Sequence, residues 1–133
     1  MAIQFADSLR NLRLNQVEID LGVSALLEGF TGPQPANCAA IDSGTKVFSM
    51  TLPADFFSDA AAGVKAKLGT WQDNSADAAG IAAHFRMKTS GGVCKVQGSI
   101  GDGSGGDLTL DNADLNVGQQ VTVTAFALTD ANP

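Results

Sequence analysis

Apolar and polar residues alternate most regularly in "IAAHFRMK", residues 81–88. Successive side chains of a β-strand point to opposite faces of the sheet, so this pattern predicts a strand with one apolar and one polar face. The alternating positions are Ala83, Phe85 and Met87 on the apolar face, and His84, Arg86 and Lys88 on the polar face. We therefore expect a strand with its apolar face on the core.

The next residues, "TSGG", predict a hairpin turn, because glycine adopts positive φ without steric cost. Alternation resumes on the return strand. Its predicted faces hold Cys94, Val96 and Ile100 on one side, and Lys95, Gln97 and Ser99 on the other. This register predicts that Cys94 is a core residue.

Four further segments have strand patterns. Residues 24–30, "SALLEGF", predict a short strand, and residues 108–110 align two leucines. Residues 46–52, "KVFSMTL", alternate with Phe48, Met50 and Leu52 on one face until Pro53 ends the run. Residues 118–128, "GQQVTVTAFAL", are rich in the valine and threonine that favour strands.

Two stretches between these segments lack a regular pattern. Residues 31–45 hold two prolines and two glycines, and they predict a long connection. Residues 54–69 are rich in alanine, but Gly63 and the poor periodicity favour irregular structure or a short strand. The small polar tail, residues 129–133, is expected to be loose.

Residues 8–21 have apolar side chains at near-helical spacing. Asp7 or Ser8 could cap the start of a helix and Gly22 could end it. Because residues 17–21 also alternate, a strand is the alternative, but we favour the helix. Ile3 and Phe5 precede it, and we expect this N-terminal segment to make contacts outside its own subunit.

Short strands separated by glycine-rich turns are typical of β-sandwiches and barrels. We therefore predict a mainly β fold, a single-domain β-sandwich or barrel with an N-terminal helix or arm. Residues 1–22 would form the arm or helix, and residues 23–133 the β-sandwich domain.

The charge of the chain excludes two classes of partner. Eight Lys and Arg stand against 14 Asp and Glu, for a net charge of −6. Nucleic acids and anionic membranes both attract basic surfaces, so we expect neither as a partner. No apolar run approaches the roughly 18 residues of a membrane span. "MAIQFADSLR" also lacks a basic segment followed by a long apolar one, so we expect no signal peptide.

The two cysteines, Cys38 and Cys94, fit no CxxC or zinc pattern. Without a secretory signal we expect two free thiols. A single cross-link formed after release from the cell is the alternative.

No catalytic pattern emerges. His84 is the one histidine, and there is no tyrosine or G-x-S-x-G motif. A catalytic triad needs a histidine that is oriented by a carboxylate and contacts a nucleophile. We expect His84 to be an ordinary residue on the polar face of its strand. We predict that the protein is not an enzyme and has no catalytic, cofactor-binding or metal residues.

The stretch "GDGSGGD", residues 101–107, offers oxygen ligands of the kind that calcium prefers. Asp102, Ser104 and Asp107 lie within six residues, and Asp111 and Asp114 follow. However, the stretch lacks the terminal glutamate of an EF-hand and does not repeat as in calcium-binding solenoids. We predict a strand connection here, with a calcium site as the alternative.

Several stretches resemble a family of small tailed-bacteriophage virion structural proteins over nearly the whole chain. They are "MAIQFADSLRN", "PANCAAIDSGT", "GTWQDNSADAAG", "AHFRM" and "GGDLTLDN…GQQVTVTAFALTDANP", in that order. The chain departs from the commoner family pattern at residues 54–69. This segment is longer and more charged than its usual counterpart, with Lys65 and Lys67. The resemblance implies a virion protein without catalytic motifs, and it favours a helix at 8–21 with a β-rich remainder.

Three roles compete for this chain, two of them in a virion and the third from a different class of protein. The first is capsid decoration by a cement protein that binds the phage major capsid protein on the outer capsid surface of the virion. It would act as a homo-oligomer, for which a trimer is typical. The second is a tail-associated role in the tube, terminator or fibre. The third is a glycan- or calcium-binding module, which one Trp and no Tyr make a poor fit. Small size, acidity and the absence of long heptad repeats favour decoration.

Overall fold

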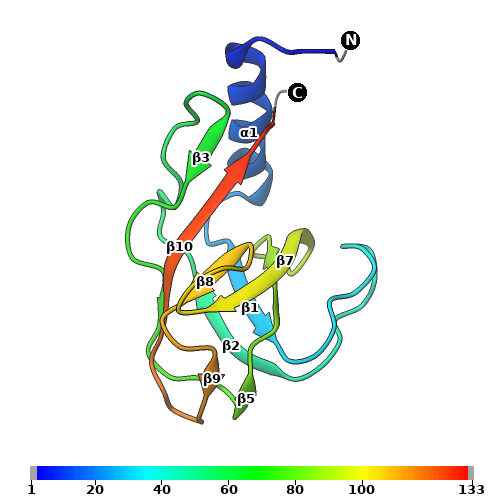
Figure 1. Ribbon diagram of the computed structural model, residues 1–133. Helices are drawn as coiled ribbons and strands as arrows, with labels where there is room; N and C mark the ends of the chain where they lie inside the picture. The colour runs from blue at the N-terminus through cyan, green and yellow to red at the C-terminus, as the bar shows by residue number, and fades with distance from the viewer. Residues whose placement is uncertain (1–2, 132–133) are drawn as a thin grey trace.

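The first element of the computed structural model, which describes residues 3–131, is helix α1, Asp7–Leu21 (Figure 1). It confirms the predicted helix and its end at Gly22, whose φ is 74° and whose N–H donates to the Glu18 carbonyl. The predicted start is wrong. Ala6 is the N-cap and makes no side-chain capping bond, while Asp7 lies inside the first turn and pairs with Arg10.

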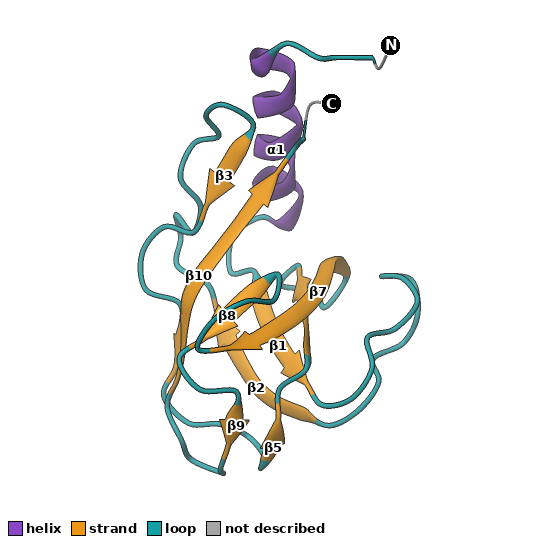
Figure 2. Cartoon of the chain, in the orientation of Figure 1, coloured by secondary structure: helices purple, strands orange, loops and turns teal. Residues whose placement is uncertain are grey.

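The remaining elements are strands, as Figure 2 shows. In chain order they are β1 Leu26–Phe30, β2 Lys46–Thr51, β3 Val64–Ala66, β4 Gln72–Asp73, β5 Gly80–Ile81, β6 His84–Lys88, β7 Cys94–Asp102, β8 Leu108–Leu110, β9 Asp114–Leu115 and β10 Val121–Thr129. The predicted mainly β fold with an N-terminal helix is confirmed.

The main sheet has the strand order β2-β1-β6-β7-β8-β10-β3, and it curls. β4 pairs with β10 and also contacts β2, where the Ser49 N–H donates to Asp73 Oδ2 at 3.1 Å. β4 thereby links β2 and β10, which lie toward opposite ends of the strand order of the curled sheet. Strands β5 and β9 form a separate pair at one end of the barrel-like body.

The core fills the inside of the curl with aromatic rings. Trp71 lies 5.5 Å from Phe57 and 5.6 Å from Phe126, measured between ring centroids, and Phe85 packs edge-on against Phe126. Phe48, Met50 and Leu52 are buried as predicted, and the neighbouring Val47 is buried as well. Strand β2 therefore contributes apolar side chains from both of its faces.

The irregular stretch 54–69 contains only the short strand β3, as its poor periodicity predicted. It folds back on itself and packs against α1, where Asn11 and Asn15 accept hydrogen bonds from the N–H groups of Gly63 and Ala60. Leu21 at the end of α1 belongs to the core cluster. The helix is thus attached to the β body along one side.

The chain near its C-terminal end is also attached to α1. Thr129 lies in β10, Arg10 donates to the Asp130 carbonyl at 2.7 Å, and Arg13 pairs with the Asp130 carboxylate at 2.9 Å. The expectation of a loose tail from residue 129 onward is therefore wrong for Thr129 and Asp130. Residues 1–2 and 132–133, which belong to the predicted arm and tail, lie outside the described residues.

The glycine-rich stretch connects β7 to β8, as predicted, but the two strands run parallel, with Ile100 opposite Leu108. Parallel neighbours ordinarily need a long crossover. Here a tight loop suffices because Gly101 and Gly106 pass against each other, and a Cβ on either one would clash with the other arm of the loop. The glycines are required by this close backbone approach.

Candidate functional site

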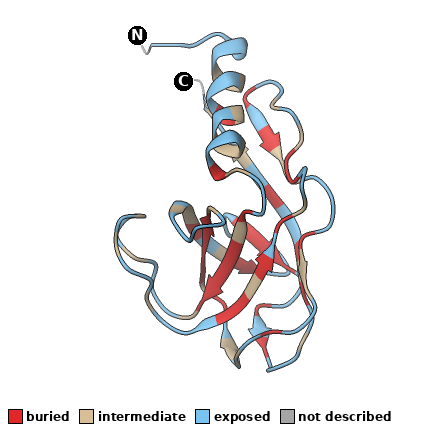
Figure 3. Ribbon diagram, turned by 180° about the vertical axis from the view of Figure 1, so that it is seen from behind, coloured by how far each residue is buried: buried red, intermediate tan, exposed pale blue. Residues whose placement is uncertain are grey.

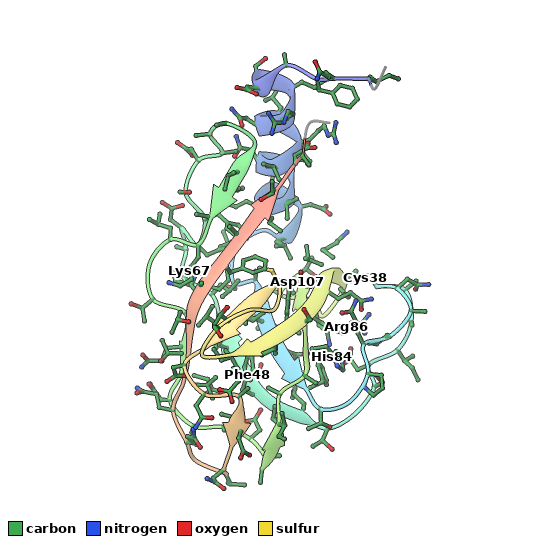
Figure 4. The ribbon with its side chains drawn as sticks, in the orientation of Figure 1. Cys38, Phe48, Lys67, His84, Arg86 and Asp107 are labelled. Atoms are coloured by element: carbon green, nitrogen blue, oxygen red, sulfur yellow. The ribbon has the colours of Figure 1, made fainter. Side chains whose placement is uncertain are left out.

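The polar face of β6 lies under residues 31–45, which we call the strap. Figure 4 shows His84 and Arg86 between the strap and β7, with Cys38 at the upper end of the strap. Every residue of β6 is buried. The predicted alternation is correct, but its polar face is covered by protein.

Arg86 is the central anchor of the strap and is 2% exposed. Its guanidinium donates to the carbonyls of Ala40, Cys38 and Asn37 at 3.0, 2.9 and 3.3 Å, and to Asp42 Oδ1 at 2.6 Å. Loop carbonyls have no strand partner, and a buried one without a hydrogen bond is costly. One side chain therefore satisfies four acceptors of the strap.

Lys88 continues this network toward the edge of the sheet. Its Nζ lies 2.7 Å from Asp42 Oδ2 and 2.6 Å from Glu28 Oε1, and Lys46 lies 3.6 Å from the same Glu28 carboxylate. The cations and carboxylates alternate, so the buried charges of Lys88 and Glu28 are both paired, while Asp42 and Lys46 are partly exposed.

The pKa values follow from this pairing. Burial alone would raise the pKa of Asp42, but hydrogen bonds from Lys88 and Arg86 outweigh it and lower the pKa below its ordinary value. Burial alone would lower the pKa of Lys88, but the bonds to Asp42 and Glu28 raise it. Asp42 and Lys88 are therefore both charged at neutral pH.

His84 and Gln97 extend the anchoring to the other end of the strap. His84 Nδ1 lies 2.9 Å from the Gly32 carbonyl, and its ring stacks on Phe30. The Gln97 amide donates to the Pro35 carbonyl at 2.8 Å. The hydrogen bond of His84 to Gly32 and that of Gln97 to Pro35 both hold the strap against the sheet.

Cys94 is not in the core, contrary to the predicted register. Val96 lies opposite Met87 and packs on the core, but an irregularity then places Cys94 opposite Lys88. Directly opposite residues share a face, so Cys94 faces the strap. Its Sγ lies 2.8 Å from Cys38 Sγ, and no disulfide joins the two in this structure. One extra residue in β7 accounts for the change of face.

The outer face of α1 is a second surface of interest. Leu12 and Ile19 are 66% and 69% exposed, Leu9 on the same face is 43% exposed, and Val23, just past the end of the helix, is 77% exposed. In Figure 3 much of α1 is pale blue, the colour of exposed residues, interrupted by tan and red segments. An apolar row of this kind is unusual on a surface that water alone contacts.

The carboxylates of the glycine-rich region serve the backbone. Asp107 Oδ2 accepts from the N–H and the hydroxyl of Ser99, and Asp102 Oδ1 accepts from the Ala113 N–H. Asp111 Oδ1 accepts from the Thr122 N–H. Within residues 3–131 there is no group of three or more His, Cys, Asp or Glu side chains placed to hold a metal ion.

Two open hollows of similar size lie on the surface. One, of about 460 Å³, includes Lys67, Asp107 and Thr124, and the other, of about 470 Å³, opens onto Cys38, Cys94 and Arg86. The second is the hollow that brings reactive side chains together. None of the helices in the described part of the chain is long and apolar enough to span a membrane.

The strap contacts could not be read from the sequence, although two signals pointed to them. The three positions on the polar face of β6 all hold side chains that can donate hydrogen bonds. The strap has two prolines and two glycines, so we expect many of its backbone carbonyls to lack a strand partner. Comparison with known proteins gives no match among family models, curated proteins or solved structures.

Proposed function

We propose that this protein is a tailed-phage virion structural protein that decorates the outer capsid surface and stabilises the shell as a homo-oligomer. The observation that carries the proposal is the uncovered apolar row on α1. The helix is attached to the β body by its other side, which leaves this row for contact with a partner.

The spacing of the row favours a second copy of the chain as its occupant. Within α1, Leu9, Leu12, Gln16 and Ile19 follow each other at intervals of three and four residues, the a and d spacing of helices that pack together. Such a seam is complementary to itself. It is too short to form a coiled coil alone, but α1 is already folded against the β body, so docking requires no helix formation.

Other features support a place on the capsid exterior. The net charge of −6 disfavours contact with packaged DNA. The strap and residues 101–107 are loops on the rim of a rigid body, where contact with capsid subunits would form. The resemblance of the sequence to tailed-phage structural proteins points the same way. Weak contacts repeated over a lattice add up through avidity.

The oligomer is tested with purified protein by light scattering after size-exclusion chromatography. We expect the wild type to be oligomeric and the double variant Leu12→Lys, Ile19→Lys to be monomeric with an unchanged fold. The matched control is Ile81→Lys, Val117→Lys, whose positions are 64% and 70% exposed but lie away from the helix. Loss of assembly in both variants, or in neither, contradicts the role of α1.

The place in the virion is tested by electron microscopy of a phage that encodes this chain. Density for the curled β body on the outer capsid surface, in hundreds of copies, supports the proposal. Density confined to the tail would establish the tail-associated alternative instead. Binding of glycans or calcium by the isolated protein would favour the third role.

A further inference from the structure

The two thiols are brought together from distant parts of the chain. Cys38 lies on the strap and Cys94 begins β7, 56 residues later, yet their Sγ atoms are 2.8 Å apart. No covalent bond holds them there. The contact follows from the irregularity in β7 and from the anchoring of the strap.

The anchors fix the backbone on both sides of the pair. Arg86 holds the carbonyl of Cys38 itself and that of Ala40 two residues later. Cys94 is held in the sheet opposite Lys88, whose ammonium also binds the strap through Asp42. A thiol pair held in this way needs little rearrangement to bond, and a bond that fits the existing geometry stores little strain.

The pair is also within reach of reagents. Both residues are half-buried, and the hollow that they line is open to solvent. Burial and the neighbouring Cys38 thiol raise the pKa of Cys94 to about 11, so this thiol keeps its proton at neutral pH. Reaction with an oxidant is therefore faster at higher pH, where more thiolate is present.

We propose that Cys38 and Cys94 form an intramolecular disulfide when the protein meets a disulfide oxidant, and that this bond fastens the strap to β7. With oxidised glutathione, one cysteine thiolate attacks a glutathione sulfur, forms a mixed disulfide and releases one glutathione thiolate. The other cysteine thiolate then attacks the protein sulfur of the mixed disulfide and releases the second glutathione. The two cysteines lose two electrons and two protons, which convert one oxidised glutathione into two reduced molecules.

The bond would close a covalent ring from residue 38 to residue 94. A cross-link across so long a loop restricts the unfolded chain, and we expect it to raise the Tm by about 10 °C. The strap, held in the reduced protein by polar contacts alone, would then also be held covalently. This inference concerns the isolated chain and stands apart from its place in a virion.

The test is incubation of purified reduced protein with oxidised glutathione at pH 8, followed by intact mass and peptide mapping without reduction. We expect loss of two hydrogen atoms, one peptide that joins Cys38 to Cys94, no free thiol, and a higher Tm that returns to its starting value on reduction. The single variants Cys38→Ser and Cys94→Ser should each keep glutathione as a stable mixed disulfide, because the second thiol is missing.

Two results would overturn the inference. One is wild-type protein that carries glutathione on its cysteines without the internal bond, and the other is cross-linking between chains in place of within them. An internal disulfide that lowers the Tm would contradict the fit of the bond to the folded geometry. The thiol count of the reduced protein and its far-UV circular dichroism serve as controls for the starting state.

Discussion

The strap face of β6 and the outer face of α1 reverse the usual relation between polarity and burial. Arg86, Lys88 and His84 are polar and buried, whereas Leu12 and Ile19 are apolar and exposed. On β6 the strap provides carbonyls that need donors, so polar side chains are what the interior requires there. On α1 nothing within the described chain covers the apolar row. Whether polar or apolar side chains suit a surface depends on what covers that surface. For β6 the cover is the strap, and for α1 we propose that it is another subunit.

Removal of Arg86 should have the largest effect on this comparison. Arg86→Ala leaves the carbonyls of Asn37, Cys38 and Ala40 without their buried donor and leaves only Lys88 on Asp42, and we expect a loss of about 3–5 kcal/mol in the free energy of unfolding. Urea denaturation followed by Trp71 fluorescence measures it. Arg86→Lys retains the charge but loses the forked geometry, and should lie between the wild type and alanine. A cost below about 1 kcal/mol for Arg86→Ala would mean that the strap is held by other contacts.

The two faces of α1 can be compared by one chemical change. Leu21→Ala removes a side chain that is 2% exposed and belongs to the core, and it should cost about 3 kcal/mol. Leu12→Ala makes the same change on the outer row and should alter the stability of the monomer by less than about 0.5 kcal/mol. Denaturation at low protein concentration separates this effect from assembly. Equal costs at the two positions would show that the outer row is packed within the monomer.

Much of this architecture was predictable because it depends on local spacing. The alternation at 81–88 predicts β6 and its two faces, and the helical spacing with Gly22 predicts α1 and its end. The cover over the polar face was not predictable, since it depends on contacts between residues about 50 positions apart, such as Arg86 with Cys38.

The error at Cys94 has a different physical cause. A single extra residue in β7 shifts the register and moves every preceding side chain to the other face. The alternating pattern of the sequence does not reveal such an irregularity. It therefore predicts Cys94 on the same face of the strand as Val96, whereas the structure has Cys94 opposite Lys88. The same shift brings the two thiols together.

Acid should loosen the strap. The folded-state pKa of Asp42 lies below its ordinary value, so its charge contributes stability that is present above about pH 4 and is lost as the pH falls through the lowered pKa. We expect Asp42→Asn to have a lower Tm than the wild type at pH 6 and a smaller difference at pH 3. Thermal unfolding from pH 3 to pH 6 measures both. A difference that stays constant with pH would show that the Asp42 charge does not hold the strap.

The smallest effect is expected where the two regions meet. Lys95 on β7 pairs with Asp20 on α1 at 3.1 Å, with side chains 34% and 54% exposed. Exposed pairs of this kind contribute little, because water screens them and both side chains lose freedom, so we expect a coupling energy below about 0.5 kcal/mol. A double-mutant cycle with Lys95→Ala and Asp20→Ala measures the coupling directly. A coupling above about 1 kcal/mol would mean that this ion pair, and not the packing of Leu21 and the Asn11 and Asn15 bonds, sets the position of α1 against the β body. The attraction between Lys95 and Asp20 would then hold α1, and with it the apolar row, in the position needed for assembly. Assembly through α1 should in that case weaken as the salt concentration is raised.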